Sequence, residues 1–133
     1  KVYACEIQKP LVEKLGEFAR LNGLSNIYPL WCDLEEVGGI KLPNNSLDVA
    51  ILVNTFFQFE LKDDAIEEIR RVLRPNGVLY VIDWSESFGG LGPQPKDVVT
   101  KEKAIDLFEA KQFILEREYE TGDHHYGIAM RKV

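Results

Sequence analysis

The hydrophobic pattern divides the chain into short apolar runs and longer stretches with helical periodicity. Four runs bounded by turn residues predict strands over residues 2–7, 27–32, 47–53 and 78–82. The run at 47–53 is almost wholly apolar, which is typical of a parallel strand covered on both faces. Pro29 lacks a backbone donor, so we expect its strand at a sheet edge or with an irregular start.

Three helices are predicted between and after these strands. The first begins at Pro10, a residue that suits the first turn of a helix. The second covers residues 62–73 and is the clearest, because its apolar residues recur at helical spacing. The third covers residues 101–110. The expected caps are Asp63 or Asp64 for the second helix and Thr100 for the third.

The order of the elements predicts the fold class. Residues 75–77 (Pro-Asn-Gly) predict a turn, and the strands expected at 113–119 and 125–131 form an antiparallel hairpin around residues 121–123. Strands separated by helices imply parallel pairing with right-handed crossovers. We therefore predict an open, doubly wound, mostly parallel α/β sheet with a C-terminal antiparallel hairpin, and one domain over residues 1–133.

Composition and charge exclude several classes of partner. The net charge of −6 argues against a nucleic-acid partner, which would require a basic face. No apolar run reaches the roughly 20 residues that a membrane span requires, and no signal peptide is visible. Cys5 and Cys32 form no metal-binding motif, so they are interpreted as reduced, adjacent thiols of a cytoplasmic protein without a bound metal.

Three predicted strands end in an acidic residue. Ligands of open α/β sheets bind beyond the carboxyl ends of the strands, which is where Glu6, Asp33 and Asp83 lie. A carboxylate at such a position can accept both hydroxyls of a ribose, as we consider for Glu6, or the amine of an adenine, as we consider for Asp33. The alternatives are a solvated charge for Glu6 and a turn-forming residue for Asp33.

Several segments together resemble the class I S-adenosylmethionine-dependent methyltransferases. VYACEIQKPLVEKL is similar to the second strand and following helix of that family, and CDLEEV to its adenine segment. LPNNSLDVAILVNTFFQF resembles the fourth strand with its loop, and EEIRRVLRPNGVLYVIDW, the strongest match, resembles the next helix, turn and strand. The C-terminal segment from VTKEKAIDLF onward resembles the last helix and closing hairpin of small bacterial members.

The resemblance implies S-adenosylmethionine as cofactor and assigns residues to it. Glu6, with its neighbour Ile7, corresponds to the end of the strand that holds the ribose. Asp33 and Leu34 correspond to the adenine site. The backbone around Asn54 and Thr55 corresponds to the methionine side. No catalytic base is assigned.

Aromatic residues and histidines near the strand ends are candidates for the acceptor side. Phe56 and Trp84 are interpreted as an aromatic wall or, alternatively, as ordinary core packing. His124 and His125 are adjacent, so at most one faces a given pocket. His125 is the candidate, with a solvated turn and a packed histidine as the alternative.

One expected part of the family pattern does not occur in the sequence. The family opens with a strand and a glycine-rich loop, whereas the chain shows no such loop, and Gly38-Gly39 and Gly89-Gly90 do not stand between a strand and a helix. We therefore expect an N-terminally truncated domain that lacks the central strand between 2–7 and 47–53. The two edges left unpaired would be filled by the absent segment, by another chain in a homo-oligomer, or by re-pairing of the sheet.

Three functions follow from these observations. The first is methyl transfer from S-adenosylmethionine to an unidentified, small-molecule acceptor, with weak or no activity in this segment alone. The second is a non-catalytic methyltransferase-like module that acts through protein association. The third is a fragment of another nucleotide-binding protein, such as a dehydrogenase, against which the Arg-Pro-Asn-Gly turn and closing hairpin argue.

Overall fold

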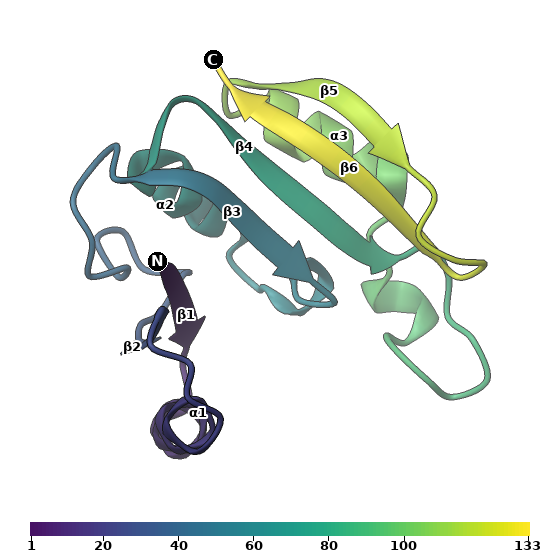
Figure 1. Ribbon diagram of the computed structural model, residues 1–133. Coiled ribbons are helices and arrows are strands. Elements are labelled where there is room, and N and C mark those ends of the chain that lie inside the picture. Colours follow the sequence, from purple (N-terminus) through teal and green to yellow (C-terminus); the bar gives the residue numbers. More distant parts are fainter.

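The computed structural model describes residues 1–133 and contains two separate sheets (Figure 1). The smaller sheet pairs two strands, and the larger has the order β3-β4-β6-β5. The elements are β1 (Val2–Glu6), α1 (Lys9–Leu21), β2 (Ile27–Trp31), β3 (Leu47–Val53), η1 (Phe56–Gln58), α2 (Lys62–Val72), β4 (Leu73–Trp84), η2 (Pro95–Asp97), α3 (Lys101–Glu109), β5 (Phe113–Tyr119) and β6 (His125–Lys132).

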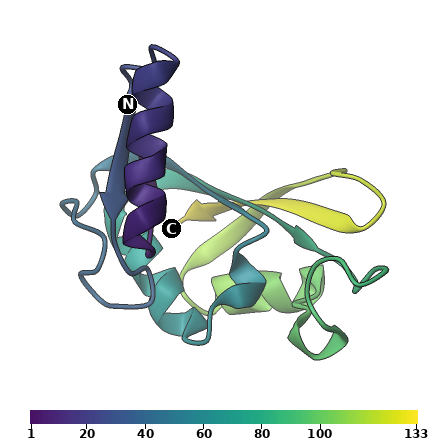
Figure 2. The ribbon, with the colours of Figure 1, turned by 90° about the horizontal axis from the view of Figure 1, so that it is seen from below.

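The smaller sheet is a parallel β-α-β unit. β1 and β2 pair in parallel from Val2 opposite Ile27 to Glu6 opposite Trp31. Helix α1 connects them and lies along β2, apart from α2 and α3 (Figure 2). Pro10 lies in the first turn of α1, as predicted. Pro29 lies on an edge strand, also as predicted, because β2 pairs only with β1.

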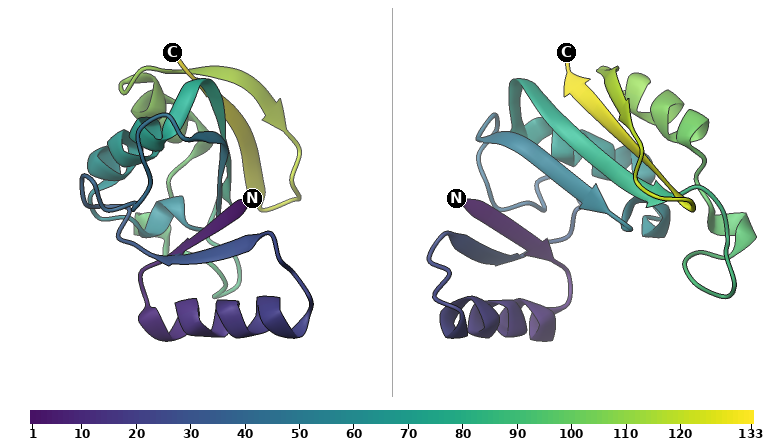
Figure 3. Two further views of the ribbon diagram at one scale, coloured as in Figure 1. Left: turned by 60° about the vertical axis from the view of Figure 1, so that its left-hand side comes forward. Right: turned by 45° about the vertical axis from the view of Figure 1, so that its right-hand side comes forward.

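The larger sheet combines parallel and antiparallel pairing. β3 and β4 are parallel, whereas β6 pairs antiparallel with both β4 and β5, which confirms the predicted C-terminal hairpin. Helices α2 and α3 cover one face of this sheet, and the other face carries no helix (Figures 1 and 3). The core lies on the covered face, where alternate residues of β4 such as Leu79 and Val81 pack against Ile66 of α2 and Phe108 of α3.

One detail of β4 differs from the prediction, and the cap of α3 agrees with it. Residues 75–77 lie inside β4 rather than in a separate turn: Leu47 pairs with Leu73 and Val49 with Val78, so residues 74–77 bulge opposite a single β3 residue. Thr100 caps α3 as predicted, since its side chain accepts from Lys103 N.

The expected cap of α2 is wrong. Leu61 occupies the cap position, and no side chain caps the helix there. Asp63 and Asp64 lie instead within the first turn, where a negative charge is favourable beside the amino end of the helix dipole. No helix in the structure is both long enough and apolar enough to cross a membrane.

A buried carboxylate joins the two sheets. Glu68 of α2 is 1% exposed, and its two oxygens accept from Gly38 N at 3.0 Å and Ile40 N at 2.7 Å, in the segment that follows β2. Arg71, one turn later, donates to both oxygens of Glu68 and to Ile40 O. Burial raises the pKa of Glu68, but the hydrogen bonds from Arg71 and the two amides outweigh it and hold that pKa below its ordinary value.

Removal of the Arg71 guanidinium should therefore destabilise the fold. We expect Arg71→Met to lower the free energy of unfolding at pH 7 by about 3 kcal/mol, the order found when a buried ion pair loses one partner. Chemical denaturation measures this change. Arg74→Met is the matched control, because the Arg74–Asp48 pair is 52% and 83% exposed at its side chains, and exposed pairs contribute about 0–1 kcal/mol. Equal losses in the two variants would contradict the buried role of Arg71.

The difference between the wild type and Arg71→Met should also depend on pH. A carboxylate with a lowered folded-state pKa stabilises the fold above its unfolded pKa, about 4.3 for Glu, and that contribution disappears as the pH falls through the folded value. The stability difference should therefore shrink below about pH 4.

Candidate functional site

The residues assigned to the cofactor lie at the carboxyl ends of the parallel strands. Glu6 ends β1 and Asp33 follows β2, while Asn54 directly follows β3. Trp84 ends β4, and His125 begins the antiparallel β6, so both lie at the same end of the larger sheet. In Figure 1 the arrowheads of β1, β3 and β4 point towards the same side of the molecule. The fold thus collects residues that are far apart in the sequence along one edge.

Glu6 is half-buried, and one of its oxygens is engaged locally. Its Oε1 accepts from Gln8 N at 3.0 Å, and no bond within the chain engages Oε2. The β1–β2 pairing continues beyond Trp31, since Cys32 N donates to Glu6 O at 3.1 Å. Ile7 is 51% exposed, and its carbonyl accepts from the Trp31 indole at 2.7 Å. The carboxylate of Glu6 is therefore held at a fixed strand end with one oxygen available.

Asp33 forms a local turn, which is the alternative to an adenine-binding role in the sequence analysis. Its Oδ1 accepts from Glu35 N at 2.9 Å. Gly39 returns the chain against this turn so closely that a Cβ at position 39 would lie 1.9 Å from Asp33 O. The backbone N–H of Leu34 donates to no group of the chain. The turn therefore leaves an acceptor, Asp33 Oδ2, and a donor, the Leu34 N–H, without partners on two adjacent residues.

Asn54 has a left-handed backbone with φ of +53°, a conformation that costs energy for a residue with a side chain. Its amide donates to Ile82 O at 2.9 Å, and its carbonyl accepts from the Gln58 side chain at 2.8 Å. The Nε2 of His125 lies 2.9 Å from Asn54 Oδ1, in position for the ring N–H to donate. Contacts from three separate elements therefore hold this strained residue.

The buried Asp83 supports the same loop from beneath. It is 1% exposed, faces the core and accepts from Phe57 N at 2.9 Å and from Trp84 N at 2.8 Å. Burial raises the pKa of Asp83, against the two amide hydrogen bonds, which lower it. Asp83 is thus the one of the three strand-end acids that is buried and anchors η1.

The three acceptor-side candidates do not come together. Phe56 is 0% exposed and packs against Phe59 and Phe108 in the core. Its expected place in a pocket wall is therefore wrong, because α2 and α3 cover it. Trp84 and His125 do meet, with ring centroids 4.3 Å apart.

His124 has partners separate from those of His125. Its Nδ1 lies 2.7 Å from Glu86 Oε1, and its ring stacks on Phe88. As expected for adjacent residues at a strand end, only His125 of the two contacts Trp84 and Asn54.

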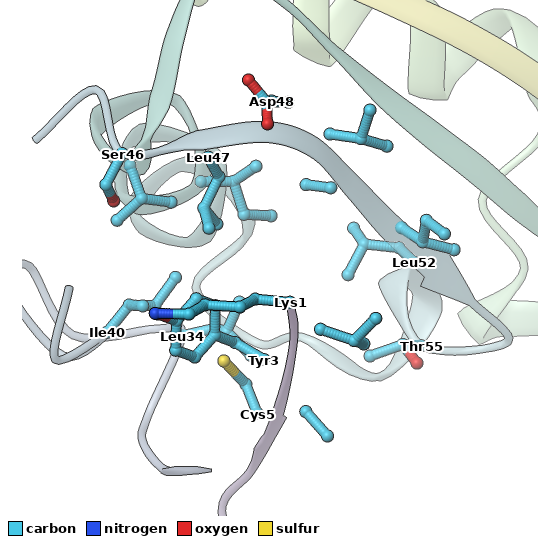
Figure 4. A pocket seen from close by; sticks show the side chains of 17 residues that line it. Lys1, Tyr3, Cys5, Leu34, Ile40, Ser46, Leu47, Asp48, Leu52 and Thr55 are labelled. Carbon is cyan, nitrogen blue, oxygen red and sulfur yellow. The ribbon is translucent and has the colours of Figure 1, made fainter. Parts of the chain in front are cut away.

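A cavity of about 940 Å³ lies between β1 and β3 (Figure 4). Two of the assigned cofactor residues, Leu34 and Thr55, line it, together with Cys5. The carboxylates of Glu6 and Asp33 are not among the lining groups, although their chain neighbours Cys5 and Leu34 are. Cys5 packs against the buried Cys32, and both thiols are free, as predicted for adjacent thiols.

Three features of this edge escaped the sequence-based predictions. The pairing of Asn54 with His125 joins residues 71 positions apart, which no local pattern reveals. The roles of Gly39 beneath Asp33 and of Asp83 beneath η1 also depend on tertiary contacts. The only signals in the sequence were a second glycine in a Gly-Gly pair and an acid at the end of a buried strand.

Comparisons with known proteins identify the family. Residues 1–81 match the family model described as "Methyltransferase domain". A S-adenosylmethionine-dependent methyltransferase from Aquifex aeolicus has 28% identity and a TM-score of 0.90, with coverage of 100% of this chain and 69% of that one. No curated protein matches the sequence.

Two further solved structures share the fold at lower identity. The [4+2]-cyclase SpnF has 18% identity and a TM-score of 0.82, over 99% of this chain and 66% of that chain. The trans-methyltransferase CalH, solved as a complex with SAH, has 14% identity and a TM-score of 0.78, over 98% of this chain and 42% of that chain.

The family model covers more than half of the chain, and the match to the Aquifex aeolicus structure covers all of the chain. This chain, which spans about two thirds of the Aquifex aeolicus and SpnF chains, belongs to the class I S-adenosylmethionine-dependent methyltransferases.

Proposed function

We propose that the protein transfers a methyl group from S-adenosylmethionine to a small-molecule acceptor, and that this chain supplies the nucleoside half of the cofactor site. The observation that carries the proposal is the half-buried carboxylate of Glu6, fixed at the end of β1 with one oxygen free. A ribose presents two adjacent hydroxyl donors, which a carboxylate at such a strand end can accept. The bound SAH of the structurally similar CalH supports the same ligand class.

The turn after β2 offers groups complementary to an adenine. Asp33 Oδ2 can accept from the exocyclic amine, and the unpartnered N–H of Leu34 can donate to a ring nitrogen. The Leu34 side chain also lines the cavity and supplies an apolar contact for the ring. The hydrogen bond from Cys32 N to Glu6 O places the start of this turn beside the end of β1, next to Glu6.

The loop after β3 supports the reacting end of the cofactor. Thr55 lines the cavity between β1 and β3, and Asn54 precedes it directly after β3. The hydrogen bonds to Asn54 from Gln58 and His125 keep its backbone in one orientation. We assign this backbone to the methionine part of the ligand.

Trp84 and His125 are assigned to the acceptor. They lie beyond Asn54 at the same edge, in contact with each other. When bound, the cofactor supplies an electrophilic methyl group. The protein residues hold the acceptor nucleophile in line with it and exclude water, which is sufficient for many such transfers. A catalytic base is therefore not part of the proposal.

The alternatives to methyl transfer are another reaction on the same fold and a non-catalytic module that acts through protein association. The fold of SpnF, whose structure is described as that of a [4+2]-cyclase, resembles this chain closely. The same architecture thus occurs in a protein described by another reaction. Cofactor binding separates the possibilities, because a module that acts only through association has no need of it.

Glu6→Ala should weaken cofactor binding. Loss of the ribose acceptor leaves the two hydroxyls without a partner, and we expect the affinity for S-adenosylhomocysteine to fall by about 1–3 kcal/mol, or roughly 5- to 150-fold. Isothermal titration calorimetry on the 133-residue chain and on the longest natural form of the protein measures this.

Glu13→Ala is the matched control, since Glu13 is an exposed residue on α1. It should leave the affinity unchanged. An unchanged affinity in Glu6→Ala would remove Glu6 from the site, and the absence of binding in every form of the protein would favour the non-catalytic alternative.

His125 should act on the cofactor through Asn54. His125→Ala removes the contact to Asn54 Oδ1 and should lower the affinity for S-adenosylhomocysteine by about 1 kcal/mol, the usual contribution of one hydrogen bond. His125→Gln retains a donor and should recover most of that loss. If the two variants bind equally weakly, the contribution of His125 does not pass through this hydrogen bond.

A further inference from the structure

The chain leaves β4 through a loop of residues 85–92, which precedes η2. Figure 1 shows the chain between β4 and η2 beyond the end of the larger sheet. The loop begins beside β6, because Ser85 N donates to His124 O at 2.9 Å. It starts where Trp84 and His125 meet, with ring centroids 4.3 Å apart. The loop therefore lies at the edge that we assign to the acceptor.

His124 holds the first half of this loop. Its Nδ1 lies 2.7 Å from Glu86 Oε1, and the Phe88 ring stacks on the imidazole with centroids 3.8 Å apart and planes 19° apart. The chain turns back after this contact, since Leu91 N donates to Phe88 O at 2.8 Å. A single residue at the start of β6 thus makes both side-chain contacts of the first half.

Gly92 brings the second half of the loop against Trp84. A Cβ at position 92 would lie 2.6 Å from both Cδ2 and Cε2, the two carbons that the rings of the indole share. That separation is too short for any side chain, so only glycine allows the backbone to rest directly on the indole. The φ of +72° at Gly92 also favours glycine. The loop is therefore seated on one of the two residues assigned to the acceptor.

The tip of the loop makes no comparable contact. Gly89 and Gly90 have φ of +52° and +76°, and no atom other than those of their chain neighbours lies within 4 Å of a Cβ built at either position. Leu91 is 61% exposed and Phe88 is 46% exposed. A segment with so few buried contacts opens locally at a small cost in free energy. The two attachments, at His124 and at Trp84, therefore decide where the loop lies.

We propose that residues 85–92 form a lid over the acceptor side of the site, and that Gly92 is the positioning residue that closes this lid on Trp84. The lid opens at Gly92 and stays attached at His124, because the two contacts belong to different halves of the loop. Closure covers the indole and excludes water from the groups beside it. The part played by the lid over the acceptor rests on the proposed function, whereas its closure on Trp84 does not.

Gly92→Ala should keep the lid open. In a Trp31→Phe background Trp84 is the only tryptophan of the chain, and we expect acrylamide to quench its fluorescence about twofold more efficiently in Gly92→Ala, because the indole loses its cover. Gly90→Ala is the matched control. Its φ of +76° imposes a similar backbone strain, but its side chain would meet no other group, so the quenching should not change.

Trp84→Leu removes the other partner of the same contact, and it tests the closure even if Gly92→Ala does not fold. The measurement is chymotrypsin cleavage between Phe88 and Gly89, identified by mass spectrometry. We expect the cleavage to become about fivefold faster, because proteolysis follows the population of the open loop. Circular dichroism confirms that the variant is folded.

His124→Ala tests the second attachment with the same cleavage. It removes the stack on Phe88 and the contact with Glu86, so the cleavage should again become about fivefold faster. Asp123→Ala is its matched control, since Asp123 is an exposed residue of the same turn, and this variant should be cleaved at the rate of the wild type.

Three results would overturn the proposal. The first is equal quenching in Gly92→Ala and Gly90→Ala, the second is cleavage of Trp84→Leu at the rate of the wild type, and the third is equal cleavage of His124→Ala and Asp123→Ala. Calorimetry with S-adenosylhomocysteine on the wild type is a separate measurement. A chain that closes its lid but does not bind this ligand would count against the proposed function alone.

Discussion

The arrangement of the site depends on the hydrogen bonds of one buried carboxylate. Since β1 and β3 do not pair, no sheet ladder fixes the smaller sheet against the larger one. Glu68 supplies this connection by accepting from Gly38 and Ile40 after β2, while Arg71 balances its charge. The turn that bears Asp33 lies directly before these two amides, so the distance from Asp33 to Asn54 depends on a contact made from α2. Burial makes that contact strong, because a carboxylate without partners there would be costly.

The larger sheet explains why its end of the site is rigid. β4 pairs with β3 on one side and β6 on the other, and it buries alternate residues against the helices. Its last two residues point to opposite faces of the sheet. Asp83 turns into the core and holds η1, while Trp84 turns outward to meet His125. The change of side from one residue to the next follows from the pleat of the strand. The strained backbone of Asn54 persists because contacts from β4, η1 and β6 constrain it.

Much of this could be predicted from the sequence, and the errors have physical causes. Every predicted strand and helix occurs in the structure, because apolar periodicity reports burial directly. The turn at residues 75–77 was misplaced because a bulge and a turn use the same residues, here Asn76 with φ of +65°. Phe56 was assigned to a pocket because it follows a strand end. The packing of α3 on it is a long-range contact that no local pattern contains. The pairing of Asn54 with His125 was missed for the same reason.

The open edges of β1 and β3 bear on how the family fold is held together. In an open α/β sheet, the ligand binds at the carboxyl ends of strands that also hydrogen-bond to one another. The pairing of the strands therefore sets the distances between the residues that contact the ligand. Here Glu6 and Asp33, which we propose for the nucleoside, follow strands on one side of the cavity between β1 and β3, and Asn54 follows the strand on the other side. A ligand that spans both sides therefore gains from anything that fixes their separation.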